Sequence, residues 1–196
     1  MNDPRPNLRA AIVQAGQLVA ATADTDLGRP TPCADFEVRA LLGHLDAVLR
    51  RVAHVVDGGA PSEVPHVIED FAESGRDATW KSDAAALEQR IDNDAVLDQM
   101  LTMPFGEAPG RAGLAVFGSE LTMHAWDLAS AIGRRDLLDE ELAAGSLAMM
   151  QSALPAEPRG GPVPFGPVVP VAPDARAYEQ LAGWLGRDPA WSAPVE

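Results

Sequence analysis

The sequence contains one cysteine and one lysine in 196 residues. A lone Cys33 excludes an intrachain disulfide and a metal cluster built from thiolates. Positive charge is scarce too: the sequence has 15 Lys and Arg residues and 29 Asp and Glu residues, so the formal net charge is −14. This surplus of acid argues against binding to nucleic acid or to an anionic membrane surface.

Long apolar runs are absent as well. No run reaches the ~18 residues needed to cross a membrane, and the start Met1–Pro4 does not resemble a signal peptide, so we expect a cytoplasmic protein. The sequence also lacks the H-E-x-x-H motif of zincin proteases and the G-x-S-x-G motif of α/β-hydrolases. Its 46% hydrophobic and 22% charged residues are those of a globular protein with a buried core.

Apolar residues recur at helical spacing in most of the chain. The stripes predict helices over 7–24, 35–57, 67–92, 111–132, 139–153 and 174–185. Asn7 and Asp35 are the expected N-caps of the first two, and Gly75 is a candidate break in the third. Residues 96–105 are predicted as a short strand or an irregular segment, with a turn over 105–110. Four substantial helices joined by short loops predict a mainly all-α, up-and-down four-helix bundle.

The last part of the chain differs in composition. After Leu154, seven prolines up to Pro173 exclude a long helix. We therefore divide the chain into a helical bundle over 1–154 and a Pro/Gly-rich extension over 155–196. The extension is expected to pack on the bundle, to carry one short helix and to be extended over 163–171.

The most informative motif is Glu120-x-x-x-His124. Four residues along a helix return to the same face, so the carboxylate and the imidazole can hold two corners of a tetrahedral metal site. His44, at the edge of the 35–57 stripe, is the best third ligand and leaves one position open for water, thiol or substrate. The pair alone arises by chance in roughly one such chain in four. The alternative is therefore a set of half-buried histidines hydrogen-bonded to their neighbours.

Two further residues have two interpretations each. Asp127 either accepts the far imidazole N–H of His124 and fixes its tautomer, or is a surface or capping carboxylate. Cys33 either has its thiol pKa lowered by a helix N-terminus or, as we favour, is a small buried side chain.

The remaining polar candidates carry less information. His54 and His66 have no partner at helical spacing. Arg159, beside two glycines, either meets an anionic substrate or is a solvated loop arginine.

Several of these motifs together resemble one known family. The segments concerned are 31–33, 38–45, 103–106, 109–110 and 120–129, followed by 165–171 and 185–191. They resemble the mycothiol-dependent maleylpyruvate isomerase metal-binding domain family of the DinB-like superfamily, in its shorter, uncharacterised branch. The resemblance implies a DinB-like bundle that binds a divalent metal through His44, Glu120 and His124. Zinc is the expected metal, with nickel or iron as alternatives.

The resemblance also implies thiol chemistry at that metal. Zinc lowers the pKa of a bound thiol and acts as a Lewis acid, so a low-molecular-weight thiol such as mycothiol would be the cofactor. We therefore expect a thiol-dependent isomerase or S-transferase acting on a small molecule, as a monomer or homodimer. Because only about 42 residues follow residue 154, where the characterised isomerase has a second domain, maleylpyruvate itself is not the predicted substrate.

Two other functions stay open at this point. One is a non-catalytic bundle that binds a metal or a ligand. The other is a metal-dependent hydrolase, which needs a general base, and Asp46 and Asp127 are the candidates for that base.

Overall fold

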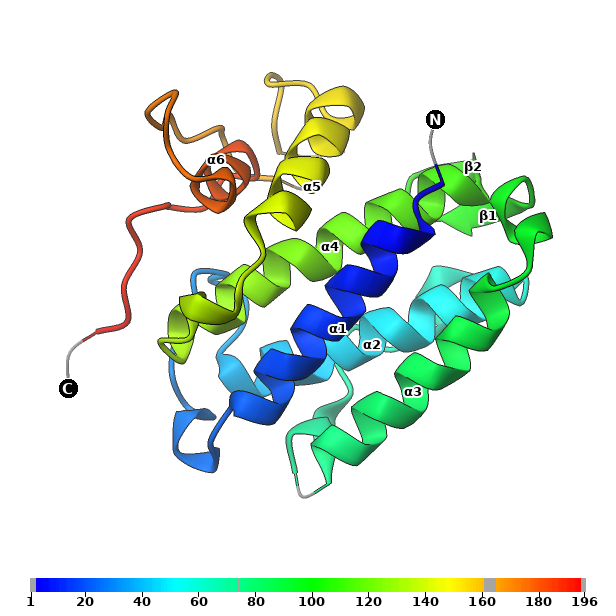
Figure 1. The fold of residues 1–196 in the computed structure, drawn as a ribbon, viewed down its shortest axis with the longest axis horizontal. Coiled ribbons are helices and arrows are strands. Elements are labelled where there is room, and N and C mark those ends of the chain that lie inside the picture. Colours follow the sequence, from blue (N-terminus) through cyan, green and yellow to red (C-terminus); the bar gives the residue numbers. More distant parts are fainter. Residues whose placement is uncertain (1–2, 74, 161–164, 195–196) are drawn as a thin grey trace.

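The computed structural model describes residues 3–73, 75–160 and 165–194. Its α-helices are α1 (Arg5–Ala21), α2 (Val38–Val56), α3 (Arg76–Ile91), α4 (Gly110–Ala131), α5 (Glu140–Ala153) and α6 (Ala177–Trp184) (Figure 1). Short 3-10 turns are η1 (Asp24–Asp26), η2 (Pro61–Glu63), η3 (Glu69–Ala72), η4 (Asp94–Leu97) and η5 (Arg135–Leu137). The strands β1 (Met100–Met103) and β2 (Gly106–Pro109) form an antiparallel hairpin.

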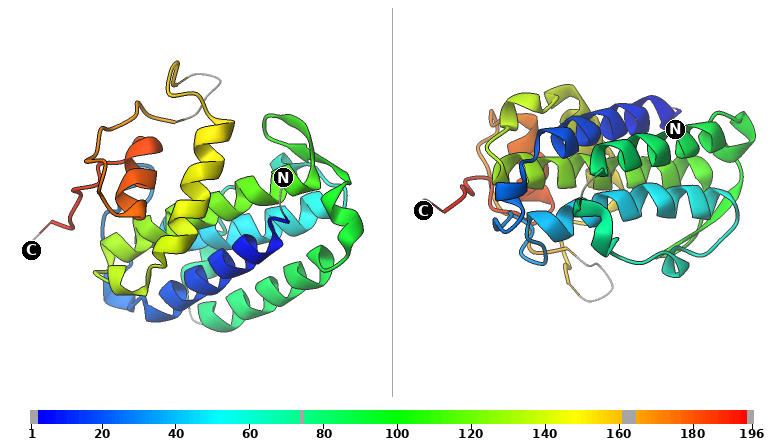
Figure 2. Two further views of the ribbon diagram at one scale, coloured as in Figure 1. Left: turned by 45° about the horizontal axis from the view of Figure 1, so that its top comes forward. Right: turned by 90° about the horizontal axis from the view of Figure 1, so that it is seen from below.

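Helices α1 to α4 surround one apolar core (Figures 1 and 2). α1 packs against α4 and α3, and α2 packs against α3 and α4. On the outer side of α4, α5 and α6 enclose a second, smaller apolar cluster that includes Trp126 and Tyr178. The prediction of a mainly all-α helical bundle is confirmed. Within the described ranges, no helix has both the length and the hydropathy of a membrane span.

Two predicted N-caps are wrong. α1 begins two residues before Asn7, with Pro4 in the cap position, because proline is tolerated at a helix start, where its missing N–H has no intrahelical partner. α2 begins three residues after Asp35, with Glu37 in the cap position. The hydroxyl of Thr31 hydrogen-bonds backbone carbonyls of the preceding segment and holds it in an irregular turn instead of a first helical turn.

In the middle of the chain, the structure confirms the predicted break at Gly75 but not the predicted turn over 105–110. Gly75 separates η3 from α3 and has a φ of +89°, a left-handed conformation that glycine adopts without strain. The turn predicted over 105–110 is wrong, because residues 106–109 form β2 and the reversal occurs at Pro104 and Phe105.

The C-terminal extension contacts the bundle through α6. This helix packs on α5 and α4, and the hydroxyl of Tyr178 accepts a hydrogen bond from Gln14 of α1 at 2.6 Å. α6 starts at Ala177, later than the predicted start at 174. Of the stretch 163–171, residues 163–164 lie outside the described residues, and 165–171 contain neither helix nor strand. The division of the chain at residue 154 stays a prediction.

Asp46 is a buried carboxyl group between α2 and α3. Its side chain is 0% exposed and lies 2.8 Å from the guanidinium of Arg50, which also donates to Asp83 of α3 at 2.9 Å. Burial, with the nearby Asp83 carboxyl, raises the pKa of Asp46 to about 7. Because Asp46 packs against α3, it is removed from the candidates for a general base.

Asp46→Asn is expected to stabilise the protein at alkaline pH. The folded-state pKa of about 7 lies above the ordinary 3.8, so the folded state binds the proton more tightly, and the free energy of unfolding falls as pH rises between these values. The variant removes this loss, so we expect its free energy of unfolding near pH 8 to exceed that of the parent by ~1–3 kcal/mol. Urea unfolding at about pH 5 and pH 8 measures it. An equal pH dependence in parent and variant would contradict it, and Asp57→Asn, at an exposed ion pair, is the control.

Candidate metal centre

Helices α2 and α4 bring the three predicted ligands together. His44 comes from α2, and Glu120 and His124 come from adjacent turns of α4. One potential ligand atom of each residue lies within 4.8 Å of the others. Nε2 of His44 is 3.5 Å from Oε1 of Glu120. The structure therefore assembles two imidazoles and one carboxylate at a single point.

The tautomer of His44 follows from its hydrogen bond. Its Nδ1 lies 2.9 Å from the backbone carbonyl of His66, and because a carbonyl oxygen only accepts, Nδ1 carries a proton. In the neutral ring Nε2 then has a free lone pair. The ring is 2% exposed, and Nε2 has no hydrogen-bond partner within the described part of the chain. A buried polar nitrogen without a hydrogen-bond partner is uncommon in proteins, and a bound metal ion would provide the missing partner.

The ring of His124 is oriented by a carboxylate. Its Nδ1 lies 3.0 Å from Oδ2 of Asp127, and the two side chains are 12% and 0% exposed. Arg187 donates to the same carboxylate through Nη2 at 3.0 Å and Nε at 3.3 Å. The interpretation of Asp127 as a surface carboxylate is therefore wrong. With Nδ1 directed at Asp127, Nε2 of His124 is available to the site.

The charge states of this group follow from burial and from the neighbouring charges. Burial lowers the pKa of His124 more than Asp127 raises it, which favours the neutral imidazole. Burial would raise the pKa of Asp127, but the charge of Arg187 and the contact with His124 lower it below its ordinary value. His124 is thus favoured as the neutral imidazole, the state that binds metals.

A glycine allows the loop that carries the His66 carbonyl to approach α2. The N–H of Ile68 donates to the carbonyl of Gly43 at 3.1 Å. A Cβ at Gly43 would lie 2.4 Å from the carbonyl oxygen of Ile68 and 2.9 Å from Val67, so a larger residue would displace this loop. Gly43 was not among the predicted site residues, although a glycine inside a predicted helix is a signal for such a close backbone approach.

Two aromatic rings complete the wall beside His44. Phe36 stacks on the His44 ring at 4.8 Å between centroids, and the His66 ring lies 4.6 Å from it. Burial and the nearby His44 lower the pKa of His66. His54, by contrast, pairs with Glu63 on the surface at 2.7 Å. His66 therefore borders the site, and His54 does not.

Arg51 is a further site residue that the sequence analysis missed. Its Nη1 lies 3.8 Å from Oε1 of Glu120, and it comes seven residues after His44, on the same face of α2 two turns later. That spacing was the available signal.

Cys33 does not have the surroundings that its reactive interpretation requires. The sulfur of Cys33 lies near His124 and Asp127, where burial and the Asp127 carboxylate raise its thiol pKa. The interpretation of a lowered pKa is therefore wrong. Arg159 lies over the ring of Trp184, 5.2 Å from its centroid, and so packs on α6.

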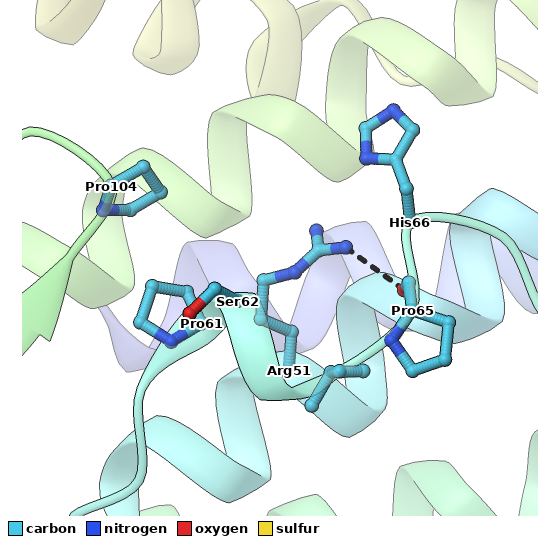
Figure 3. A pocket seen from close by; sticks show the side chains of 7 residues that line it. Arg51, Pro61, Ser62, Pro65, His66 and Pro104 are labelled. Carbon is cyan, nitrogen blue, oxygen red and sulfur yellow. Dashed lines mark hydrogen bonds between the residues drawn. The ribbon is translucent and has the colours of Figure 1, made fainter.

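Two neighbouring cavities lie in this part of the molecule. The larger, of about 1350 Å³, contains the three candidate ligands. Its wall also includes Cys33 and Arg187 and the side chains of Met123, Met149, Met150, Leu154 and Phe165. The smaller, of about 380 Å³, surrounds Arg51 and Ser62 (Figure 3). His66 and Pro104 border both cavities.

The donor set fits a divalent metal. Two imidazoles with free Nε2 lone pairs and one carboxylate are the His₂Glu combination of catalytic zinc sites, which leave one position open. Imidazole and carboxylate ligands also suit iron and nickel. The orphaned Nε2 of His44 is the observation in this structure that a metal would explain.

Comparisons with known proteins give one family model and two relatives. The family model described as the mycothiol maleylpyruvate isomerase N-terminal domain matches residues 8–129, which include all three candidate ligands. Two relatives are uncharacterised proteins of Mycobacterium tuberculosis, from strains CDC 1551 and H37Rv. Each is 30% identical over 179 residues, covering 91% of this chain and 94% of the relative. No solved structure matches the chain.

Proposed function

We propose that this chain, which belongs to the mycothiol maleylpyruvate isomerase N-terminal domain family, binds a divalent metal through His44, Glu120 and His124. Zinc is the expected metal. We further propose that it uses a low-molecular-weight thiol to isomerise a small molecule, or acts as an S-transferase that joins the thiol to that molecule through its sulfur. The family match supports a DinB-like, metal-related protein. The reaction is our proposal.

One observation carries the metal assignment. Both imidazoles have Nδ1 engaged, His44 by a backbone carbonyl at 2.9 Å and His124 by Asp127 at 3.0 Å. Nε2 of His44 lies 3.5 Å from the carboxylate of Glu120, and Nε2 is the ring nitrogen that His124 has left to bind a metal. Histidines that only pack at the edge of a core would not need two separate hydrogen bonds that both place the ring proton on Nδ1.

The cavity supports a reaction between two small molecules. Bound at this site, zinc would lower the pKa of a thiol and act as a Lewis acid. The cavity of about 1350 Å³ exceeds the ~300–1,000 Å³ common for one ligand, so a thiol and a substrate fit together.

The hydrolase alternative has less support. Of the two carboxylates considered as a general base, Asp46 packs against α3 with Arg50 and Asp83. Asp127 is occupied by His124 and Arg187. Neither is free to take a proton from water, which favours a thiol as the nucleophile.

Cobalt substitution tests the proposal. We expect the purified protein to take up one Co²⁺ per chain, and N-acetylcysteine, used as the thiol probe, to produce a sulfur-to-cobalt charge-transfer band. Absence of any metal uptake would refute the proposal, whereas metal uptake without the band would favour a non-catalytic metal-binding bundle. Cys33→Ser is the matched control, because it ensures that the band arises from the added thiol.

A further inference from the structure

Arg51 is a buried cation beside the proposed metal ligands. Its side chain is 9% exposed, and Nη1 lies 3.8 Å from Oε1 of Glu120. Nη2 donates to the backbone carbonyl of Pro65 at 3.2 Å, and Figure 3 shows the guanidinium directed between Pro104 and His66. A buried guanidinium is costly unless it is paired, so these two contacts account for its position.

The contact with Pro65 connects Arg51 to a second ligand. Pro65 directly precedes His66, whose carbonyl lies 2.9 Å from Nδ1 of His44. Neighbouring carbonyls of one loop therefore contact Arg51 and His44. Only the φ and ψ dihedrals of His66 separate the two acceptors, so a displacement of the Pro65 carbonyl also displaces the His66 carbonyl. Arg51 thus lies within 3.8 Å of the Glu120 carboxylate and is connected to His44 through the neighbouring carbonyls of Pro65 and His66.

We propose that Arg51 is a positioning residue of the metal centre. It holds Oε1 of Glu120 toward the two imidazoles and fixes the loop that orients His44. This inference rests on the proposed metal binding by His44, Glu120 and His124. On this inference, Arg51 and the loop beside the smaller cavity support the metal site in the larger cavity.

Arginine suits this position better than lysine. Its planar group offers five N–H donors in a fixed fork, so it can contact a carbonyl and a carboxylate in two directions. A lysine ammonium is a single point charge on a flexible stem. Arg51→Lys therefore keeps the charge near Glu120 but cannot maintain both contacts.

Metal affinity and the cobalt spectrum test the inference. Zn²⁺ affinity is measured by competition with a chromophoric chelator for the parent, Arg51→Met, Arg51→Lys and Arg39→Met. We expect Arg51→Met to weaken binding ~10- to 100-fold, as for other residues that orient metal ligands, and Arg51→Lys to lie between it and the parent. Arg39→Met is the control, since Arg39 is on the same helix in an exposed pair with Glu73; it should match the parent.

The cobalt d–d absorption separates positioning from a merely structural role. If Arg51 positions Glu120, the spectrum of the cobalt-loaded Arg51→Met variant changes. If Arg51 only braces the loop, the melting temperature falls while spectrum and affinity match the parent, which overturns the inference. Should Arg51→Met not fold, parental affinity and spectrum in Arg51→Lys overturn it equally. A parent protein that binds no metal overturns the proposed function and this inference together.

Discussion

His124→Ala is expected to abolish stoichiometric metal binding. The change removes one of three donors, and losing even a residue that only orients a ligand costs ~10- to 100-fold in affinity. We therefore expect affinity to fall by more than about 100-fold, so that metal measured by mass spectrometry drops from one ion per chain to a trace. Asp127 stays paired with Arg187 in the variant, so the fold should persist.

The matched control for this experiment is His54→Ala. His54 is on α2 like His44, but its imidazole pairs with Glu63 on the surface. This variant should keep the full metal content. Parental affinity in His124→Ala, or equal losses in both variants, would show that the three residues do not form the site.

Arg187→Met is expected to destabilise the protein by ~3–5 kcal/mol, because it leaves a buried carboxylate without its cation. Asp127 is 0% and Arg187 15% exposed, with 3.0 Å between Oδ2 and Nη2, so solvent screens the pair little. The charge of Arg187 also helps to hold the pKa of Asp127 below its ordinary value. The free energy of unfolding in urea measures the effect.

The double variant Asp127→Asn/Arg187→Met should recover part of this loss, since it removes both charges. Arg134→Met is the control for a surface ion pair, because Arg134 and Asp136 are 41% and 62% exposed; we expect a change below ~1 kcal/mol. Parental stability in Arg187→Met would show that this contact between the extension and α4 does not contribute to the fold.

The sequence by itself determined the helices and the three candidate ligands. Apolar residues at a period of 3.6 mark the buried face of each helix, so the stripes predicted α2 and α4. The same period places Glu120 and His124 on one face of α4, and His44 lies at the edge of the α2 stripe. Two neighbouring helices with facing stripes bring such edges together. The N-cap at Asp35 was wrong because hydrogen bonds of Thr31 compete with the first helical turn.

Only the tertiary structure decided how these ligands are oriented and charged. The carbonyl of His66 is 22 residues from His44 in sequence, and Arg187 is 60 residues from Asp127. Such contacts depend on the path of loops, which carry no periodic signal. Burial of Asp46 against Asp83 of α3, and of Arg51 beside Glu120 of α4, is likewise a property of packed helices. Local spacing thus selects which residues can meet, while long-range contacts set their tautomers, their charges and the room around them.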